Sequence, residues 1–297
     1  MGRSIIFFFI MVSSVEIISA QTSITLDTTK MLADDVLRTE ALLKGGIKIQ
    51  HQRVTCWFPK DSLAMIRMEA ITDSINMGIV ATDKTMKVPL DWQKYGVDDV
   101  IKIFFPTDDF ISHANQDLGL VYIPYWRIAR GKSPWLHEVI HVMLTTKHGN
   151  WYNDFTREER ALYKPTWLAE GLADYLSLFI SRKEGYPIYD VFSDSFRTDF
   201  DTLFIESIQE GQTQDIIPFI GNKGHSELLS GSDRFRYAPT FYYGSCSLTK
   251  FIATKYGLEV LLEAISVVNK EHEIIESRTG KTMEQIKKEW RNELGIE

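Results

Sequence analysis

Residues 134–144 read "PWLHEVIHVML", so two histidines and a glutamate stand in a segment that is otherwise apolar. We expect a helix from about 134 to 147, and a helix this apolar belongs in a protein core. Buried polar side chains need partners, because an unpaired one is costly. The fold must therefore supply partners for His137, Glu138 and His141.

The spacing of the two histidines supports two interpretations. Residues four apart share one helix face, so His137 and His141 can direct both imidazoles at one ion. Glu138 then lies beside them, free to hold a water molecule, in the arrangement H-E-x-x-H. The alternative is a core helix in which both histidines are hydrogen-bonded within the protein.

A catalytic zinc ion takes three protein ligands and leaves one position for water. His148 falls near the same face as His141, but too far along the helix for one ion unless the helix ends first. His225 is a second candidate. Glu170, in the apolar segment "WLAEGLADY", is a better one, because a buried carboxylate needs a partner and a metal ion is one. The alternative for Glu170 is a salt bridge with an arginine or lysine.

Three neighbours of Glu170 fit the metal interpretation. Gly171 and Ala173 have small side chains, which let this helix approach the histidine-bearing helix closely. Asp174 lies one turn after Glu170, where it can accept a hydrogen bond from the far nitrogen of a ligand histidine. The two segments together predict a metal centre between two helices.

With these motifs the chain resembles the gluzincin zinc metallopeptidases, a clan that includes thermolysin and the zinc aminopeptidases. The shared core of the clan is an H-E-x-x-H helix followed by an E-G-x-A helix. Within the clan, "YYGSCSLTKFIATKYG" followed by "TGKTMEQIKKEW" resembles the small secreted peptidase-MA-like domains. The resemblance covers residues from about 100 to 297.

The resemblance implies one zinc ion per chain, bound by His137, His141 and Glu170. It also implies that Glu138 is the general base and that Asp174 orients a zinc histidine. In such a site zinc lowers the pKa of its water, and the base takes the proton as the water attacks a carbonyl. The expected partner is accordingly a peptide or protein substrate.

The oxyanion formed in this reaction needs one donor besides zinc. In the aminopeptidase branch a tyrosine supplies it, and Tyr242 and Tyr243 are the local candidates, with His225 as a third. Register does not separate the two tyrosines. Their alternative role is packing, as for most tyrosines in a core helix.

Strand patterns precede helix patterns along the chain. We expect a strand pair or a bulged strand within 47–58, and strands at 100–106 and 119–126. The predicted helices cover 22–44, 134–147, 166–182, 238–257, 258–268 and 282–294, and a further helix follows Asp61 or Ser62, either of which can cap it. The helix at 134–147 is expected to start with Ser133 as its cap and Pro134 as its first residue. This order predicts an α+β fold with two lobes, and the resemblance to the gluzincins implies that the fold is thermolysin-like. The N-terminal lobe, 21–132, carries a mixed sheet with helices, and 133–297 forms a mostly helical lobe of the same catalytic domain.

Apolar spacing also predicts the buried faces of the first two helices. The first is expected to bury Met31, Leu32, Val36, Leu37 and Leu43, and the second Leu63, Ile66, Ile71 and Ile75.

Residues 119–126, "GLVYIPYW", have the character of a sheet edge, because Pro124 cannot donate to a strand ladder. In gluzincins an extended substrate adds itself beside the sheet edge next to the zinc site. We therefore expect 119–126 to be the substrate-side strand. The alternative is a bordering strand whose aromatic residues only pack in the core.

The first twenty residues predict a signal peptide. Arg3 is followed by a short apolar run at 5–12, and a small residue, Ala20, offers a cleavage point. The run is too short to cross a bilayer, Glu16 interrupts its extension, and no later segment is apolar enough. We expect a secreted or periplasmic protein without stable membrane insertion; the alternative is an uncleaved anchor.

Charge excludes one class of partner. The net charge is -7 and no cluster of lysine and arginine stands out, which argues against nucleic acid.

The sequence leaves the state of the cysteines and the class of reaction open. Cys56 and Cys246 can pair outside the cytosol, but their sequence separation does not decide this. A metallohydrolase of non-peptide amides or esters needs the same site, and an inactive binding or scaffold protein keeps the fold. The presence of both Glu138 and Glu170 favours activity. Endopeptidase and exopeptidase action are not distinguished.

Overall fold

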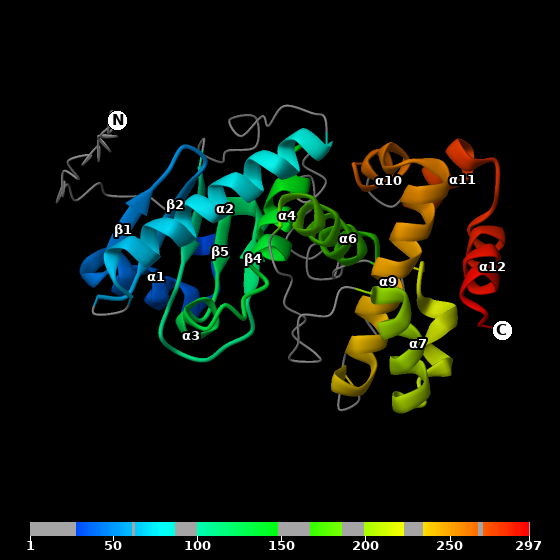
Figure 1. The fold of residues 1–297 in the computed structure, drawn as a ribbon, viewed down its shortest axis with the longest axis horizontal. Coiled ribbons are helices and arrows are strands. Elements are labelled where there is room, and N and C mark those ends of the chain that lie inside the picture. Colours follow the sequence, from blue (N-terminus) through cyan, green and yellow to red (C-terminus); the bar gives the residue numbers. More distant parts are fainter. Residues whose placement is uncertain are drawn as a thin grey trace, which may run out of the picture.

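The computed structural model describes residues 28–60, 63–86, 100–147, 167–185, 199–222, 234–266 and 270–296. In chain order they form η1 (Thr28–Lys30), α1 (Ala33–Gly45), β1 (Ile47–Gln50), β2 (Val54–Phe58), α2 (Met65–Met86), β3 (Ile101–Phe104), β4 (His113–Asn115), η3 (Gln116–Leu118), β5 (Leu120–Tyr122), α3 (Tyr125–Ala129), α4 (Trp135–Lys147), α6 (Trp167–Glu184), α7 (Phe200–Gly211), η4 (Gln214–Phe219), α9 (Arg234–Tyr256), α10 (Leu258–Ile265), α11 (Glu271–Thr279) and α12 (Met283–Leu294). The chain is a mixed α/β protein, with a small sheet in its N-terminal part and helices in its C-terminal part (Figure 1).

The sheet has the strand order β1-β2-β3-β5-β4. The two outer pairs, β1 with β2 and β4 with β5, are antiparallel, and the inner pairs are parallel. Every residue of β2, β3 and β5 is buried, whereas β4 is only partly buried along its length. This is the pattern of central strands covered on both faces and of an exposed edge.

The prediction that 119–126 is an edge strand is wrong. Only Leu120–Tyr122 forms a strand, β5, and it lies between β3 and β4. Pro124 comes after the strand and precedes the first residue of α3, so it removes no hydrogen bond from the ladder. The edge on this side of the sheet is β4.

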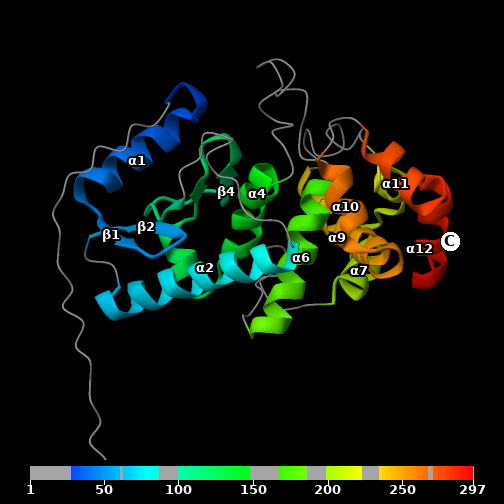
Figure 2. The same cartoon turned by 90° about the horizontal axis from the view of Figure 1, so that it is seen from above.

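Helices cover both faces of the sheet. Figure 2 shows α1 on one side of it and α2 on the other. The face toward α1 carries a stacked row of rings, with Trp57 on Phe104 at 4.7 Å and Phe104 on Tyr122 at 5.4 Å. The opposite face packs its aliphatic side chains against α2 and α4 in a separate cluster that contains Ile75, Val139 and other apolar residues.

The predicted buried face of α1 is also wrong. Leu32 and Leu37 are 64% and 65% exposed, while Asp35, Thr39 and Leu42 are buried. The helix docks through polar contacts, which apolar spacing cannot reveal. In α2, similarly, Ile66 of the predicted face is 78% exposed, although Ile75 is buried as expected.

Helices make up the C-terminal part, and the described residues after 126 contain no strand, as predicted. They gather around α9, which packs against α6 and α7 (Figure 1). This helix begins at Arg234, earlier than the predicted 238, and contains Pro239 near its start. Helix α11 was not predicted, while α12 begins with Thr282 in a capping box with Gln285.

The two cysteines do not form a disulfide. Cys56 and Cys246 are free and buried in separate clusters, one at the sheet and one among the C-terminal helices. Burial raises the pKa of the Cys56 thiol to about 12. Both therefore behave as small apolar residues.

Several predictions concern residues outside the described ranges: the signal peptide at 1–20, the capping residues Asp61 and Ser62, and the histidines His148 and His225. Within the described part of the chain, none of the helices combines the length and the apolar character that crossing a membrane requires.

Gly171 offers a test of the packing of α6 on α9. A Cβ atom there would lie 2.3 Å from Thr249 Oγ1 and 2.5 Å from the Ser245 carbonyl oxygen, so Gly171→Ala overpacks the contact. We expect it to lower the free energy of unfolding by about 1–3 kcal/mol. Urea unfolding of the metal-free protein measures this. Gly45→Ala is the control, because nothing lies within 4 Å of its Cβ position; equal stability of the two variants contradicts the contact.

Candidate metal centre

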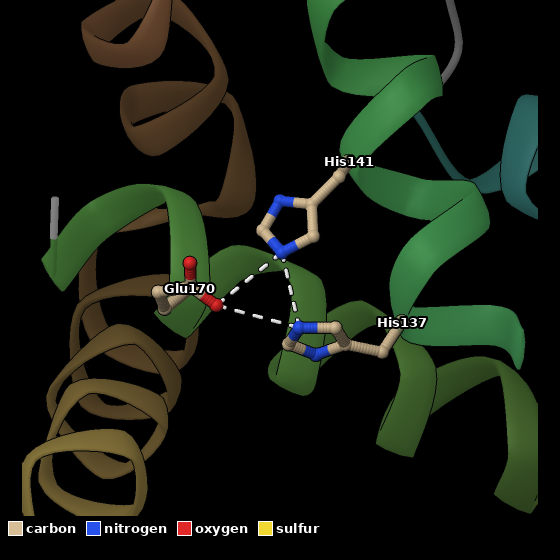
Figure 3. Close-up of side chains that lie close together, drawn as sticks. All are labelled: His137, His141 and Glu170. Carbon is tan, nitrogen blue, oxygen red and sulfur yellow. Dashed lines mark hydrogen bonds and ion pairs between the residues drawn. The ribbon is translucent and has the colours of Figure 1, made fainter. Parts of the chain in front are cut away.

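Three side chains from two neighbouring helices converge on one point. His137 and His141 come from α4 and Glu170 comes from α6 (Figure 3). The two Nε2 atoms are 3.0 Å apart, and each is 3.3 Å from Oε2 of Glu170. Among the described residues, this group of histidine and carboxylate ligands is suited to hold a metal ion. The structure thus brings together the three predicted ligands.

The separations fit one small ion. Zinc holds nitrogen and oxygen ligands at about 2.0–2.2 Å, so two ligand atoms on a tetrahedron lie about 3.3–3.6 Å apart. The observed 3.0–3.3 Å lies close to this range. Two Nε2 atoms at 3.0 Å cannot both carry a proton directed at the other, so at least one presents its lone pair. Two imidazoles and one carboxylate are a donor set that suits a divalent ion such as zinc.

A hydrogen bond from the second helix orients His137. Its Nδ1 lies 2.6 Å from Oδ1 of Asp174, one turn after Glu170 on α6. Because a carboxylate accepts, Nδ1 donates, and Nε2 is left to face Glu170 and His141. Asp174 therefore fixes both the orientation and the tautomer that a ligand histidine needs.

The centre holds more negative than positive groups. Glu138 and Glu170 are 7% and 5% exposed, and Asp174 adds a third carboxylate next to two imidazoles. Buried carboxylates are costly without a compensating cation. A divalent ion at the point of convergence would supply that charge.

Without an ion, a proton takes part of this role. Burial by itself lowers the pKa of His137, but the Asp174 and Glu170 carboxylates raise it well above its usual range. Burial likewise opposes ionisation of Glu170, but His141 and His137 lower the pKa of this carboxyl well below its usual range. The site therefore favours a positive charge between the imidazoles and an ionised Glu170.

Glu138 lies beside the cluster without belonging to it. It follows His137 on α4, and burial raises its pKa despite the opposing effect of both imidazoles. The residue is thus a buried carboxylate that follows one of the clustered histidines on α4. Its position suits proton transfer, as the H-E-x-x-H spacing predicts.

Close helix packing holds the cluster, but Gly171 does not make the contact predicted for it. Gly171 faces α9, where Ser245 and Thr249 lie against it, and not the histidine-bearing helix. At the start of α4, the ring of Trp135 lies over Gly78 of α2, which leaves no space for a side chain there. Helix α4 therefore packs against both α2 and α6, and the contact with Gly78 had no signal in the sequence.

The two candidate tyrosines differ in their surroundings. Tyr243 is 4% exposed, and its ring meets Phe200 of α7 edge-on at 5.9 Å. Tyr242 is half-buried beside Phe241. Tyr243 thus has a packing role, and Tyr242 is the more accessible of the two.

The sequence prediction missed the side of the site formed by β4. This strand packs against α4, and its His113 lies near enough to Glu138 for their charges to interact. A three-residue strand has no recognisable alternation, so no local pattern pointed to it.

Comparisons with protein-family models, with curated proteins and with solved structures found no match to this chain.

The cluster predicts a single tight metal site. We expect the chain to bind one zinc ion, and Glu170→Ala, His137→Ala and His141→Ala to lose it. Competition with a chromogenic chelator measures the affinity. His51→Ala is the matched control, since His51 lies between β1 and β2, outside the cluster, and is partly exposed. If Glu170→Ala binds zinc as tightly as the wild type does, Glu170 is not a metal ligand.

Asp174 should matter less than the ligands. Asp174→Asn keeps the shape of the side chain but loses its charge, so His137 is held less well in the ligand tautomer. We expect zinc affinity to fall about 10- to 100-fold, with one ion still bound. The same chelator competition tests this. A complete loss of zinc would make Asp174 a ligand, and no change would make its hydrogen bond irrelevant to the site.

Proposed function

We propose that this protein is a zinc-dependent peptidase. The observation that supports the proposal most is the convergence of His137, His141 and Glu170 within 3.0–3.3 Å, with Glu138 next along α4. Two imidazoles and one carboxylate are a ligand set of catalytic zinc sites that keep a position for water. Burial of the group in a core, with a hydrogen bond behind His137, also favours a resident ion over a chance cluster.

Each residue then has a distinct task. Zinc, when bound, lowers the pKa of a water molecule toward neutrality and polarises a substrate carbonyl. Glu138 accepts the proton of the attacking water and can return it to the leaving amine. His137, His141 and Glu170 hold the ion, and Asp174 keeps His137 in its ligand tautomer.

The arrangement of the elements supports a gluzincin-like, thermolysin-like catalytic core as part of the proposal. An H-E-x-x-H helix, α4, lies beside a helix with the E-G-x-A motif, α6, next to the edge of a mixed sheet. The substrate would pair with β4, because β4 is the edge strand that contacts α4. A peptide added along β4 would extend the sheet at the edge strand that packs against α4, the helix that carries Glu138.

Tyr242 is the preferred donor to the oxyanion. It is more accessible than Tyr243, whose ring is held among Phe200 and other core side chains of the C-terminal helices. As part of the proposal, the activity lies outside the cytosol, in a secreted or periplasmic protein, because residues 1–20 have the pattern of a signal peptide.

The proposal is tested by removing the base and keeping the metal. In Glu138→Gln we expect zinc to remain bound and the hydrolysis of a mixed peptide library to fall by about 10²- to 10⁴-fold, since the amide cannot accept the proton. Mass spectrometry of the products and metal analysis of the same samples measure both.

Glu210→Gln is the control, because Glu210 is an exposed carboxylate at the end of α7. A variant at Glu138 that cleaves as fast as the wild type contradicts the proposed base. A wild type that binds zinc but cleaves neither peptides nor other amides and esters indicates a binding or scaffold protein.

A further inference from the structure

A second buried carboxylate pairs with a histidine at the sheet edge. Asp35 of α1 is 1% exposed, and its Oδ2 lies 2.8 Å from Nε2 of His113 on β4. The other ring nitrogen of His113, Nδ1, lies 2.9 Å from the carbonyl oxygen of Ile111. The ring also stacks on Tyr122 of β5 at 5.3 Å.

These contacts fix the charge of His113. A carbonyl oxygen and a carboxylate only accept hydrogen bonds, so both ring nitrogens must donate. Asp35 is ionised, because the Arg38 guanidinium donates to its other oxygen at 2.8 Å and this cation, with His113, lowers the pKa of the carboxyl. His113 is therefore an imidazolium, with neither nitrogen left for a substrate or for proton transfer.

The pair belongs to a longer polar network that anchors the edge. Arg38 also donates from Nε and Nη2 to Asp108, at 2.9 and 2.7 Å, and its guanidinium lies 4.0 Å above the ring of Phe110. The segment that leads into β4 is thus tied to α1 at successive points. The strand itself is short, so its backbone alone holds it weakly.

We propose that the Asp35–His113 pair is a positioning device for β4, in which the imidazolium ties the edge strand to α1 and so sets it beside α4 and Glu138. His113 is a positioning residue, not a catalytic one. The consequence for catalysis rests on the proposed peptidase function; the tie between α1 and β4 does not.

The tie has a defined pH range. The titratable and charged groups around the ring are Asp35 and Arg38 on α1, Asp108 before β4, Tyr122 on β5 and Glu138 on α4. Burial lowers the pKa of His113, but Asp35 and the Ile111 carbonyl raise it above its usual value. Burial opposes ionisation of Asp35, but His113 and Arg38 lower its pKa.

The direction in which pH changes the stability of the tie follows from these pKa shifts. A histidine with a raised pKa contributes its stability fully below its unfolded value and loses it as pH rises through the folded value. A carboxyl with a lowered pKa loses its contribution as pH falls through the folded value. The Asp35–His113 ion pair is therefore complete at pH values between the pKa of Asp35 and the pKa of His113. Above the pKa of His113, one ring nitrogen loses its proton and one hydrogen bond breaks.

Hydrogen exchange of the amides at residues 111–115, with NMR titration of the His113 ring, tests the tie on metal-free protein. In the wild type we expect protection, corrected for intrinsic rates, to fall about tenfold as pH rises through the ring's titration, which must lie above that of a free histidine. His113→Gln should show low protection that no longer follows this titration. Asp35→Asn, which keeps the shape and should fold, should move the titration to lower pH. His51→Gln is the control.

Kinetic measurements as a function of pH distinguish a failure of this inference from a failure of the proposed function. With a peptide substrate, KM should rise with pH along the His113 titration while kcat changes little, and His113→Gln should remove that dependence. If no substrate is cleaved, the exchange and NMR results still decide the tie. An ordinary titration of His113, or the same pH dependence of exchange in His113→Gln as in the wild type, overturns the inference.

Discussion

The packing of α4 against α6 is the contact on which the rest of the site depends. It places Glu170 opposite His137 and His141, so that a buried carboxylate meets two imidazoles within 3.3 Å. Helix α2 packs against both α4 and α6, and α9 lies against α6 so closely that only glycine fits at 171. Because interiors are close-packed, these helices hold the three ligand atoms in one geometry.

In the described part of the chain, Asp35 and Glu170 are both buried helix carboxylates that face a histidine, but their surroundings differ. Asp35 is enclosed by donors, since Arg38 and His113 both donate to it. Glu170 faces two nitrogens that also face each other, so the three atoms surround one common point. The first arrangement is complete as an ion pair. The second becomes complete with a cation, which is why it supports a metal centre.

The Asp35–His113 pair and the cluster around Glu170 both involve helices that contact β4. Helix α1 and its polar network hold β4 from one direction, and α4 packs against β4 from the other. The sheet edge that would receive a substrate is thus positioned by charged groups far away in the sequence. This arrangement explains why α1 exposes Leu32 and Leu37 and buries Asp35 and Thr39 instead. Its docking depends on hydrogen bonds more than on apolar area, so the apolar spacing of its sequence indicated the wrong face.

Local patterns in the chain were enough to predict the helices at 134–147 and around Trp167, the i, i+4 spacing of the histidines, and the isolated carboxylate Glu170. These follow from helix periodicity and from the cost of burying charge, which act within one or two turns. Which strand forms the edge of the sheet, and that α1 docks through Asp35, could not be predicted from such patterns. Both depend on pairings between residues distant in the chain, such as His113 with Asp35, and no local pattern encodes a partner 78 residues away.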